Sequence, residues 1–123
     1  MKVYKINVLK QKIEEVEAPF NKDDGGVDIK FIAEEIGCDF FDVVRLSDGD
    51  AIFVDDMGLC RRGVQGAFNL KGYDQPLIGN GLVIGSNWEG ESKEPVISKK
   101  DLTGLIQFGC VVLEGEPAEK NNN

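Results

Sequence analysis

The dipeptide Asp48-Gly49 separates two β-rich runs within residues 40–56, and no other feature of the sequence constrains the fold as strongly. Asp-Gly favours a two-residue hairpin turn, because both central residues must accept positive φ angles. A two-residue loop would place Val44 opposite Phe53 and Asp42 opposite Asp55. Both faces of the paired strands carry apolar residues, so we expect other layers to cover both and the hairpin to lie at the centre of the sheet.

Two helices are expected beside this sheet. Asp28 can cap a helix whose isoleucines at 29, 32 and 36 share one face with Ala33, and Gly37 can end it in the left-handed conformation. Ser98 opens a second helix in a capping-box pattern with Asp101, and we expect Gly109 to end that helix.

Strands are expected around these elements. Residues 4–8 alternate as a half-buried strand does, and residues 13–18 form the return strand, although IEEVE also fits a helix. Shorter strands are expected at residues 67–70, 77–78, 82–84 and 110–113. The fold class is therefore α+β, one domain over residues 1–114 with a mostly antiparallel sheet of about five strands and two helices. Residues 115–123 lack large apolar side chains and are expected to form a disordered tail.

Composition narrows the functional classes. The chain has 123 residues, 41% of them hydrophobic, which suits one globular domain without a membrane span or a signal peptide. Three scattered cysteines without CxxC spacing predict reduced thiols and a cytoplasmic location. The sequence contains no histidine, which excludes Ser-His and Cys-His catalysis and histidine metal sites. We expect no cofactor, and an enzyme is the less favoured class.

Charge is unevenly distributed along the chain. The net charge is −8, yet residues 57–88 carry +2, so the remainder carries −10. An acidic exterior argues against nucleic acid as a partner, because binding nucleic acid needs a broad basic face. It leaves room for one local site for an anion.

The acid-poor segment, residues 58–73, is the candidate for that site. Its glycines predict a loop with a short strand, and its polar side chains are of the kinds that hold phosphate or stack on a base: Arg61, Arg62, Gln65, Asn69, Lys71 and Tyr73. A nucleotide-like ligand would suit them. The alternative is that the basic residues pair with carboxylates of the same chain.

Three aspartates form the candidate metal site. In the expected register Asp42 and Asp55 face each other with Asp56 adjacent, and a divalent cation would relieve their repulsion. Solvation at a strand end, or pairing with Arg45 or Arg61, is the simpler account. The glycine-rich run at residues 79–85 lacks the spacing of a dinucleotide or phosphate loop and indicates bends in a strand instead.

The order of motifs resembles a known family. FDVVRLSDGDAIFVDDMGL, then FNLKGYDQPLIGNGLVIGSNWEGES, then an amphipathic helix is similar to a family of small domains of unknown function encoded by phages, plasmids and other bacterial mobile elements. The resemblance covers roughly residues 38–108. It implies an accessory protein in a bacterial cytoplasm and implies no catalytic residue.

Three functional hypotheses follow. The first is an accessory protein that acts by binding another protein, with its acidic surface as one means. The second is a binder of a small phosphorylated ligand through residues 58–73, and the third is a metal-dependent enzyme using Asp42, Asp55 and Asp56. An exposed edge at the N-terminal strand would in addition allow a homodimer.

Overall fold

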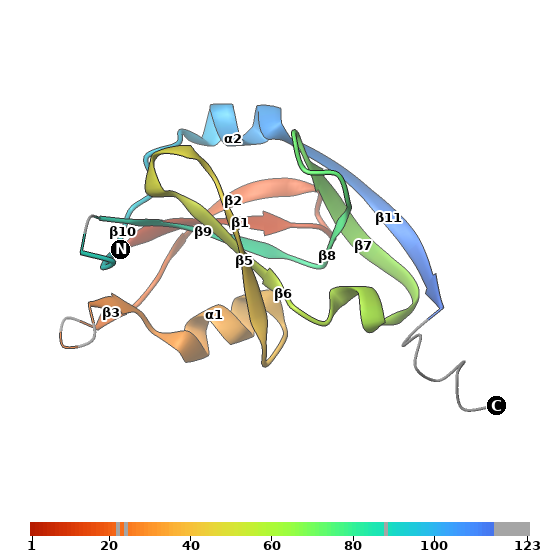
Figure 1. Cartoon of the computed structure of the whole chain (residues 1–123), viewed down its shortest axis with the longest axis horizontal. Coiled ribbons are helices and arrows are strands. Elements are labelled where there is room, and N and C mark those ends of the chain that lie inside the picture. Colours follow the sequence, from red (N-terminus) through yellow and green to blue (C-terminus); the bar gives the residue numbers. More distant parts are fainter. Residues whose placement is uncertain (22, 24, 88, 115–123) are drawn as a thin grey trace.

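An antiparallel sheet, in which strands far apart in the sequence lie side by side, organises the molecule. The computed structural model describes residues 1–21, 23, 25–87 and 89–114. Its larger sheet is six-stranded, with all pairs antiparallel and β10 (Ser92–Lys93) attached to β9 (Figure 1). The order of the other strands is β2 (Lys12–Glu17), β1 (Lys2–Asn7), β9 (Gly81–Ser86), β6 (Ala51–Asp55) and β5 (Phe41–Arg45).

A second sheet has three strands and projects toward one end of the molecule. It runs in the order β11 (Ile106–Glu114), β7 (Arg62–Leu70) and β8 (Leu77–Ile78). A two-stranded pair, β3 (Phe20–Asn21) and β4 (Gly26–Val27), completes the strands. The expected α+β class, with mostly antiparallel strands and two helices, is confirmed; the expected arrangement in one sheet of about five strands is not.

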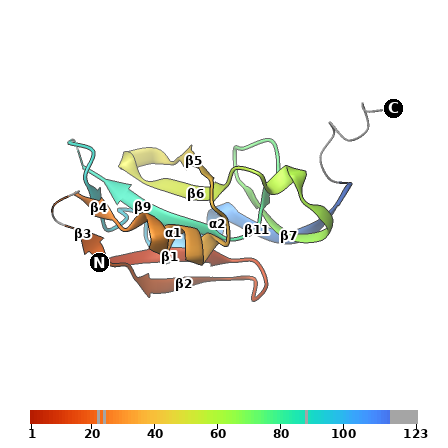
Figure 2. The same cartoon turned by 90° about the horizontal axis from the view of Figure 1, so that it is seen from below.

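The six-stranded sheet is covered on both faces. On one face lies α1 (Ile29–Ile36), as Figure 2 shows. Its buried Ile32 and Ile36 pack with Val3, Leu82 and Ile84. On the other face, Phe68 of the three-stranded sheet and Leu102 of α2 (Lys99–Leu105) pack with Ile6, Ile52 and Val83. The two hydrophobic clusters therefore lie on opposite faces of one sheet.

The helix ends follow local chemistry. Asp28 caps α1 by accepting from the Lys30 N–H at 3.0 Å, and Gly37 ends it with φ 82°, as expected. Ser98 caps α2 by accepting from the Asp101 N–H at 3.1 Å. The expected end of α2 at Gly109 is wrong, because the chain becomes extended at Ile106 and β11 continues through Gly109 to pair with β7.

The hairpin exists but its expected register and position are wrong. Asp48 and Gly49 take positive φ angles, 62° and 86°, yet the loop has three residues, because the Leu46 N–H donates to the Asp50 carbonyl at 2.8 Å. This shifts the pairing by one residue, so Asp42 lies opposite Val54. The hairpin is not central either, since β9 holds the middle of the sheet and β5 an edge.

The expected loop at residues 58–73 is mostly a strand. After a short 3-10 turn, η2 (Gly58–Cys60), the chain enters the nine-residue strand β7, which pairs with β11 along its whole length. The glycines in this segment do not break the strand. The Cβ of a larger residue at Gly66 would lie 2.9 Å from Cγ2 of Val8, so this glycine lets β7 approach the turn after β1 closely.

Candidate functional site

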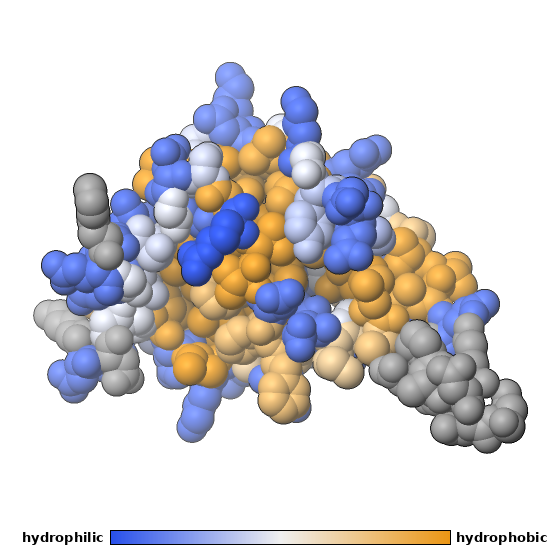
Figure 3. Space-filling model, viewed as in Figure 1, coloured by the Kyte–Doolittle hydropathy of each residue, from blue (hydrophilic) through white to orange (hydrophobic). Residues whose placement is uncertain are grey.

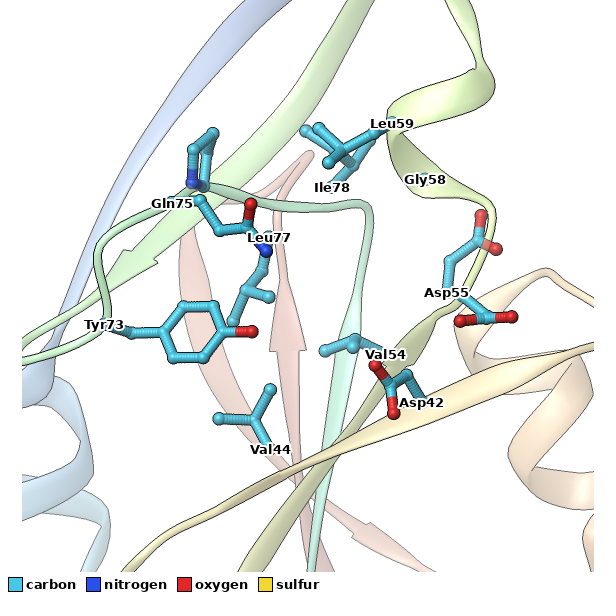
Figure 4. Close-up of a pocket in the computed structure, with 12 residues that line it drawn as sticks. Asp42, Val44, Val54, Asp55, Gly58, Leu59, Tyr73, Gln75, Leu77 and Ile78 are labelled. Atoms are coloured by element: carbon cyan, nitrogen blue, oxygen red, sulfur yellow. The ribbon is translucent and has the colours of Figure 1, made fainter. Parts of the chain in front are cut away.

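The acidic pocket lies between the hairpin, η2 and the segment that leads into β8. Its apolar floor is formed by Val44, Val54, Leu77 and Ile78, and it offers about 80 Å³ of accessible space. Polar groups stand at its rim: Asp42, Asp55, Asp56, Tyr73 and Gln75. Figure 4 shows Tyr73 and Gln75 extending from one side of this space and Asp42 from the other.

The three carboxylates of the acidic pocket are not equivalent. Asp55 is the buried one, with a side chain 6% exposed, and its Oδ2 accepts from Nη2 of Arg61 at 2.6 Å and from Nε at 2.7 Å. Its Oδ1 accepts from the Met57 N–H at 2.9 Å, which fixes the turn after β6. A two-point contact with a guanidinium neutralises this carboxylate, so Asp55 is best understood as a structural group.

Asp42 and Asp56 keep their negative charge toward solvent. Both are exposed, and neither forms an ion pair with a basic residue in the described part of the chain. The Asp42 carboxylate accepts from the N–H of Val43 at 2.8 Å. The acidic pocket therefore combines two unneutralised carboxylates with an apolar floor.

The remaining rim groups broaden what the acidic pocket can bind. The phenol of Tyr73 can donate and accept a hydrogen bond, and its ring face attracts cations. The Gln75 amide supplies both a donor and an acceptor. Carboxylates attract a cation, while the floor favours methylene groups. The arrangement suits a cation on an apolar stem, such as the side chain of lysine or arginine.

The residues expected to hold an anion are not gathered in one place. Arg62 begins β7 and Asn69 lies near its end, a separation of about 23 Å at the usual rise of a strand. Arg61 is engaged by Asp55, and the Gln65 amide donates to the Arg62 carbonyl at 2.9 Å. Asn69 and Lys71 line a separate depression beside α2, whereas Tyr73 belongs to the acidic pocket.

The aspartates expected to hold a metal do not converge. In the observed register Asp42 lies opposite Val54, and Asp55 lies opposite Phe41. Although Asp55 lines the acidic pocket with Asp42 and Asp56, its carboxylate is bound by Arg61. In residues 1–21, 23, 25–87 and 89–114 no group of three or more Asp, Glu, Cys or His side chains could hold a metal ion. The pairing of Asp55 with Arg61, the simpler account, is confirmed.

The cysteines are all free thiols. Burial raises the pKa of the Cys38 thiol, with the negative charge of Asp55 adding to the effect, and its Sγ lies 3.2 Å from the Phe40 carbonyl. A raised pKa reduces the thiolate fraction and hence the reactivity of Cys38. Cys110, on β11, is exposed.

Sequence reasoning missed two residues. Gln75 stands at the rim of the acidic pocket, and nothing in its sequence context marks it. Asp50 is 1% exposed, and its carboxylate accepts from the N–H groups of Val96 at 2.9 Å and Ile97 at 2.8 Å. These two hydrogen bonds tie the hairpin to the segment that precedes α2.

Comparison with known proteins gives no match. No family model matches the chain, and neither a curated protein nor a solved structure matches it. In the part of the chain that the structure describes, no helix has the length and apolar character needed to span a membrane. The resemblance to mobile-element domains therefore stays a prediction, and the acidic pocket has to be interpreted from its own chemistry.

Proposed function

We propose that this protein acts by binding another protein, and that its acidic pocket receives a lysine or arginine side chain of that partner. The observation that carries the proposal is the pair of unneutralised carboxylates, Asp42 and Asp56, beside an apolar floor. A small molecule with the same chemistry would be an amine on an aliphatic stem. The net charge of −8 would in addition attract a basic partner over a distance.

Each part of the acidic pocket would recognise one part of such a side chain. The methylene stem would pack on Val44, Val54 and Leu77, and the charged end would reach the two carboxylates. Tyr73 could lie against the cation through its ring face. Since Arg61 already neutralises Asp55, an incoming cation would have Asp42 and Asp56 as its partners.

The two other hypotheses draw less support. A nucleotide-like ligand would need polar groups from both ends of β7 at once, and Arg61, just before β7, already has Asp55 as its partner. A metal-dependent reaction would need the carboxylates of Asp42, Asp55 and Asp56 together, and Arg61 already engages that of Asp55. The bacterial mobile-element origin and the cytoplasmic location are proposals that rest on the resemblance and on the cysteine pattern.

Titration of the isotope-labelled protein with short peptides tests the proposal. Three peptides that differ at one central residue, lysine, arginine or glutamine, would be added while amide resonances are recorded. We expect the two basic peptides to shift resonances of Asp42, Tyr73 and Gln75 in a salt-dependent way, and the glutamine peptide to leave them in place.

Two matched variants locate the effect. The double variant Asp42→Asn with Asp56→Asn should abolish the shifts, whereas Asp48→Asn removes one charge from the hairpin loop, outside the acidic pocket, and should preserve them. Equal shifts with the glutamine peptide, or equal losses in the Asp48→Asn control, would contradict the proposal.

A further inference from the structure

The outer edge of β11 is the longest unprotected strand edge in the described part of the chain. β11 pairs with β7 on one side, and no described strand pairs with its other side. Its sequence from Ile106 to Leu113, IQFGCVVL, carries no charge. A long, uncharged edge is a template for pairing with another chain.

The hydrogen bonds reveal which backbone groups this edge offers. The Lys71 N–H donates to the Leu105 carbonyl at 2.9 Å, so Leu105 and Lys71 form a hydrogen-bonded pair of the antiparallel ladder. Because such pairs alternate, the N–H and C=O groups of Phe108, Cys110 and Val112 point away from β7.

The other long edges are protected. On β5, the same alternation directs the Val43 N–H outward, and the Asp42 carboxylate accepts from it at 2.8 Å. On β2, four of the six residues are charged, KIEEVE. The N-terminal strand β1, expected to offer an exposed edge, is an inner strand between β2 and β9.

The end of β11 that projects from the hydrophobic core also carries exposed apolar side chains. Val112 is 77% exposed. Val64, directly opposite it on β7, is 71% exposed. Figure 3 shows hydrophobic surface where the ends of β7 and β11 project from the rest of the molecule. At the other end of β11, Ile106 and Phe108 pack against the core.

We propose that β11 pairs antiparallel with β11 of a second copy of this chain, around a two-fold axis at Cys110. This register pairs outward-pointing groups with each other and would form about ten hydrogen bonds. It places Phe108 of each copy directly opposite Val112 of the other, an aromatic and β-branched pair of the kind that stabilises antiparallel strands. The two three-stranded sheets would become one continuous sheet.

Charge favours a second copy over a charged peptide as the occupant. The edge has no charged side chain before Glu114 with which to select such a peptide. Two chains of net charge −8 repel each other over most of their surfaces, but residues 57–88, which include β7 and β8, carry +2. Pairing through β11 therefore brings two copies together where their repulsion is least.

Sedimentation velocity over a series of protein concentrations tests the pairing. Strand pairing without a second packed layer gives a small interface, so we expect a dimer that forms as the concentration rises. Val112→Lys adds two charges to the dimer at the pairing edge and should raise its dissociation constant by about tenfold or more. Val64→Lys adds the same charges to an equally exposed valine one strand away and should leave the constant nearly unchanged.

A cross-linking measurement fixes the register. A short bis-maleimide should join two copies through Cys110, because hydrogen-bonded residues opposite each other have Cα atoms about 5.5 Å apart. Cys110→Ser should abolish the product, whereas Cys38→Ser should not, since Cys38 is half-buried in the segment between α1 and β5. A monomer at every concentration up to about 1 mM, a dimer weakened equally by both lysine variants, or a cross-link independent of Cys110 would overturn the proposal.

Discussion

The two main sheets of this protein differ in how well their edge strands are protected from pairing with another chain. The six-stranded sheet buries both faces, and its outer strands carry either many charges, as in β2, or an internal acceptor for an outward N–H, as in β5. The three-stranded sheet covers the core with Phe68 and Leu70, then projects beyond it with an uncharged edge. The outer strands of the first sheet are therefore protected, whereas the described edge of the second sheet is unpaired and uncharged up to Leu113.

The comparison teaches that net charge alone says little about where a protein binds. The chain carries −8, yet its charged groups are concentrated around the first sheet, where lysines and glutamates pair along β1 and β2. The acidic pocket stands where the two sheets meet, with Asp42 from the hairpin on one side and Tyr73 and Gln75 on the other. Function is therefore expected at this boundary and beyond it.

The largest expected difference in the free energy of unfolding is between substitutions at two positions on β7. Phe68 is fully buried between the sheets, so Phe68→Ala should lower the free energy of unfolding by about 3–5 kcal/mol. Val64 lies four residues earlier on the same face and is 71% exposed, so Val64→Ala should change it by less than about 0.5 kcal/mol. Urea denaturation measures both, and similar losses would show that the projecting end also belongs to the core.

A smaller effect contrasts two glycines. A Cβ at Gly81, in β9, would lie 2.9 Å from Cγ2 of Ile52 and 3.1 Å from Cζ of Phe68, so Gly81→Ala should cost about 1–3 kcal/mol through overpacking. A Cβ at Gly109, in β11, would meet no atom within 4 Å, and Gly109→Ala should be neutral or stabilise by about 0.5 kcal/mol. Thermal unfolding of both variants tests this difference in sign.

The smallest expected effect on stability concerns Glu14, on the charged edge strand β2. The Asn7 amide, which donates to Glu14 at 2.9 Å, lowers the pKa of the Glu14 carboxyl below its ordinary value, with Lys10 and Lys12 contributing. A carboxyl whose pKa is lower in the folded state adds stability above its unfolded pKa, and this is lost as the pH falls through the folded value.

Glu14→Gln should therefore destabilise the protein at neutral pH, and the difference from the wild type should shrink as the pH falls below about 4. Denaturation at a series of pH values measures it. Glu34→Gln is the control, because Glu34 is exposed and forms no ion pair within the described residues. A difference that stays constant with pH would contradict the role given to Glu14.

Elements with local signals were predictable from the sequence. Asp28, Gly37 and Ser98 marked helix ends because capping depends on hydrogen bonds within a few residues of the chain. The hairpin was expected for the same reason, but its register was not. One additional residue in the loop shifts the pairing by one position, so each residue of β5 faces a different partner on β6. Asp42 and Asp55 were thus wrongly placed opposite each other.

Long-range partners were not predictable. β7 appeared to be a loop because its glycines suggest bends, whereas pairing with β11, some forty residues later, holds it extended along nine residues. The acidic pocket combines residues from the hairpin with residues that precede β8, so no contiguous motif marks it. The charge pattern did indicate that residues 58–73 differ from the rest, but not that Arg61 is engaged by Asp55.

Amide hydrogen exchange at the two long edges tests the central contrast most directly. The outward N–H groups are those of Phe108, Cys110 and Val112 on β11, and those of Ile13, Glu15 and Glu17 on β2, because Ala18 donates to the Met1 carbonyl. We expect protection of the β11 amides to increase with protein concentration and the β2 amides to exchange rapidly throughout. Rapid exchange of both sets at every concentration, or protection that increases at β2 instead, would contradict the account.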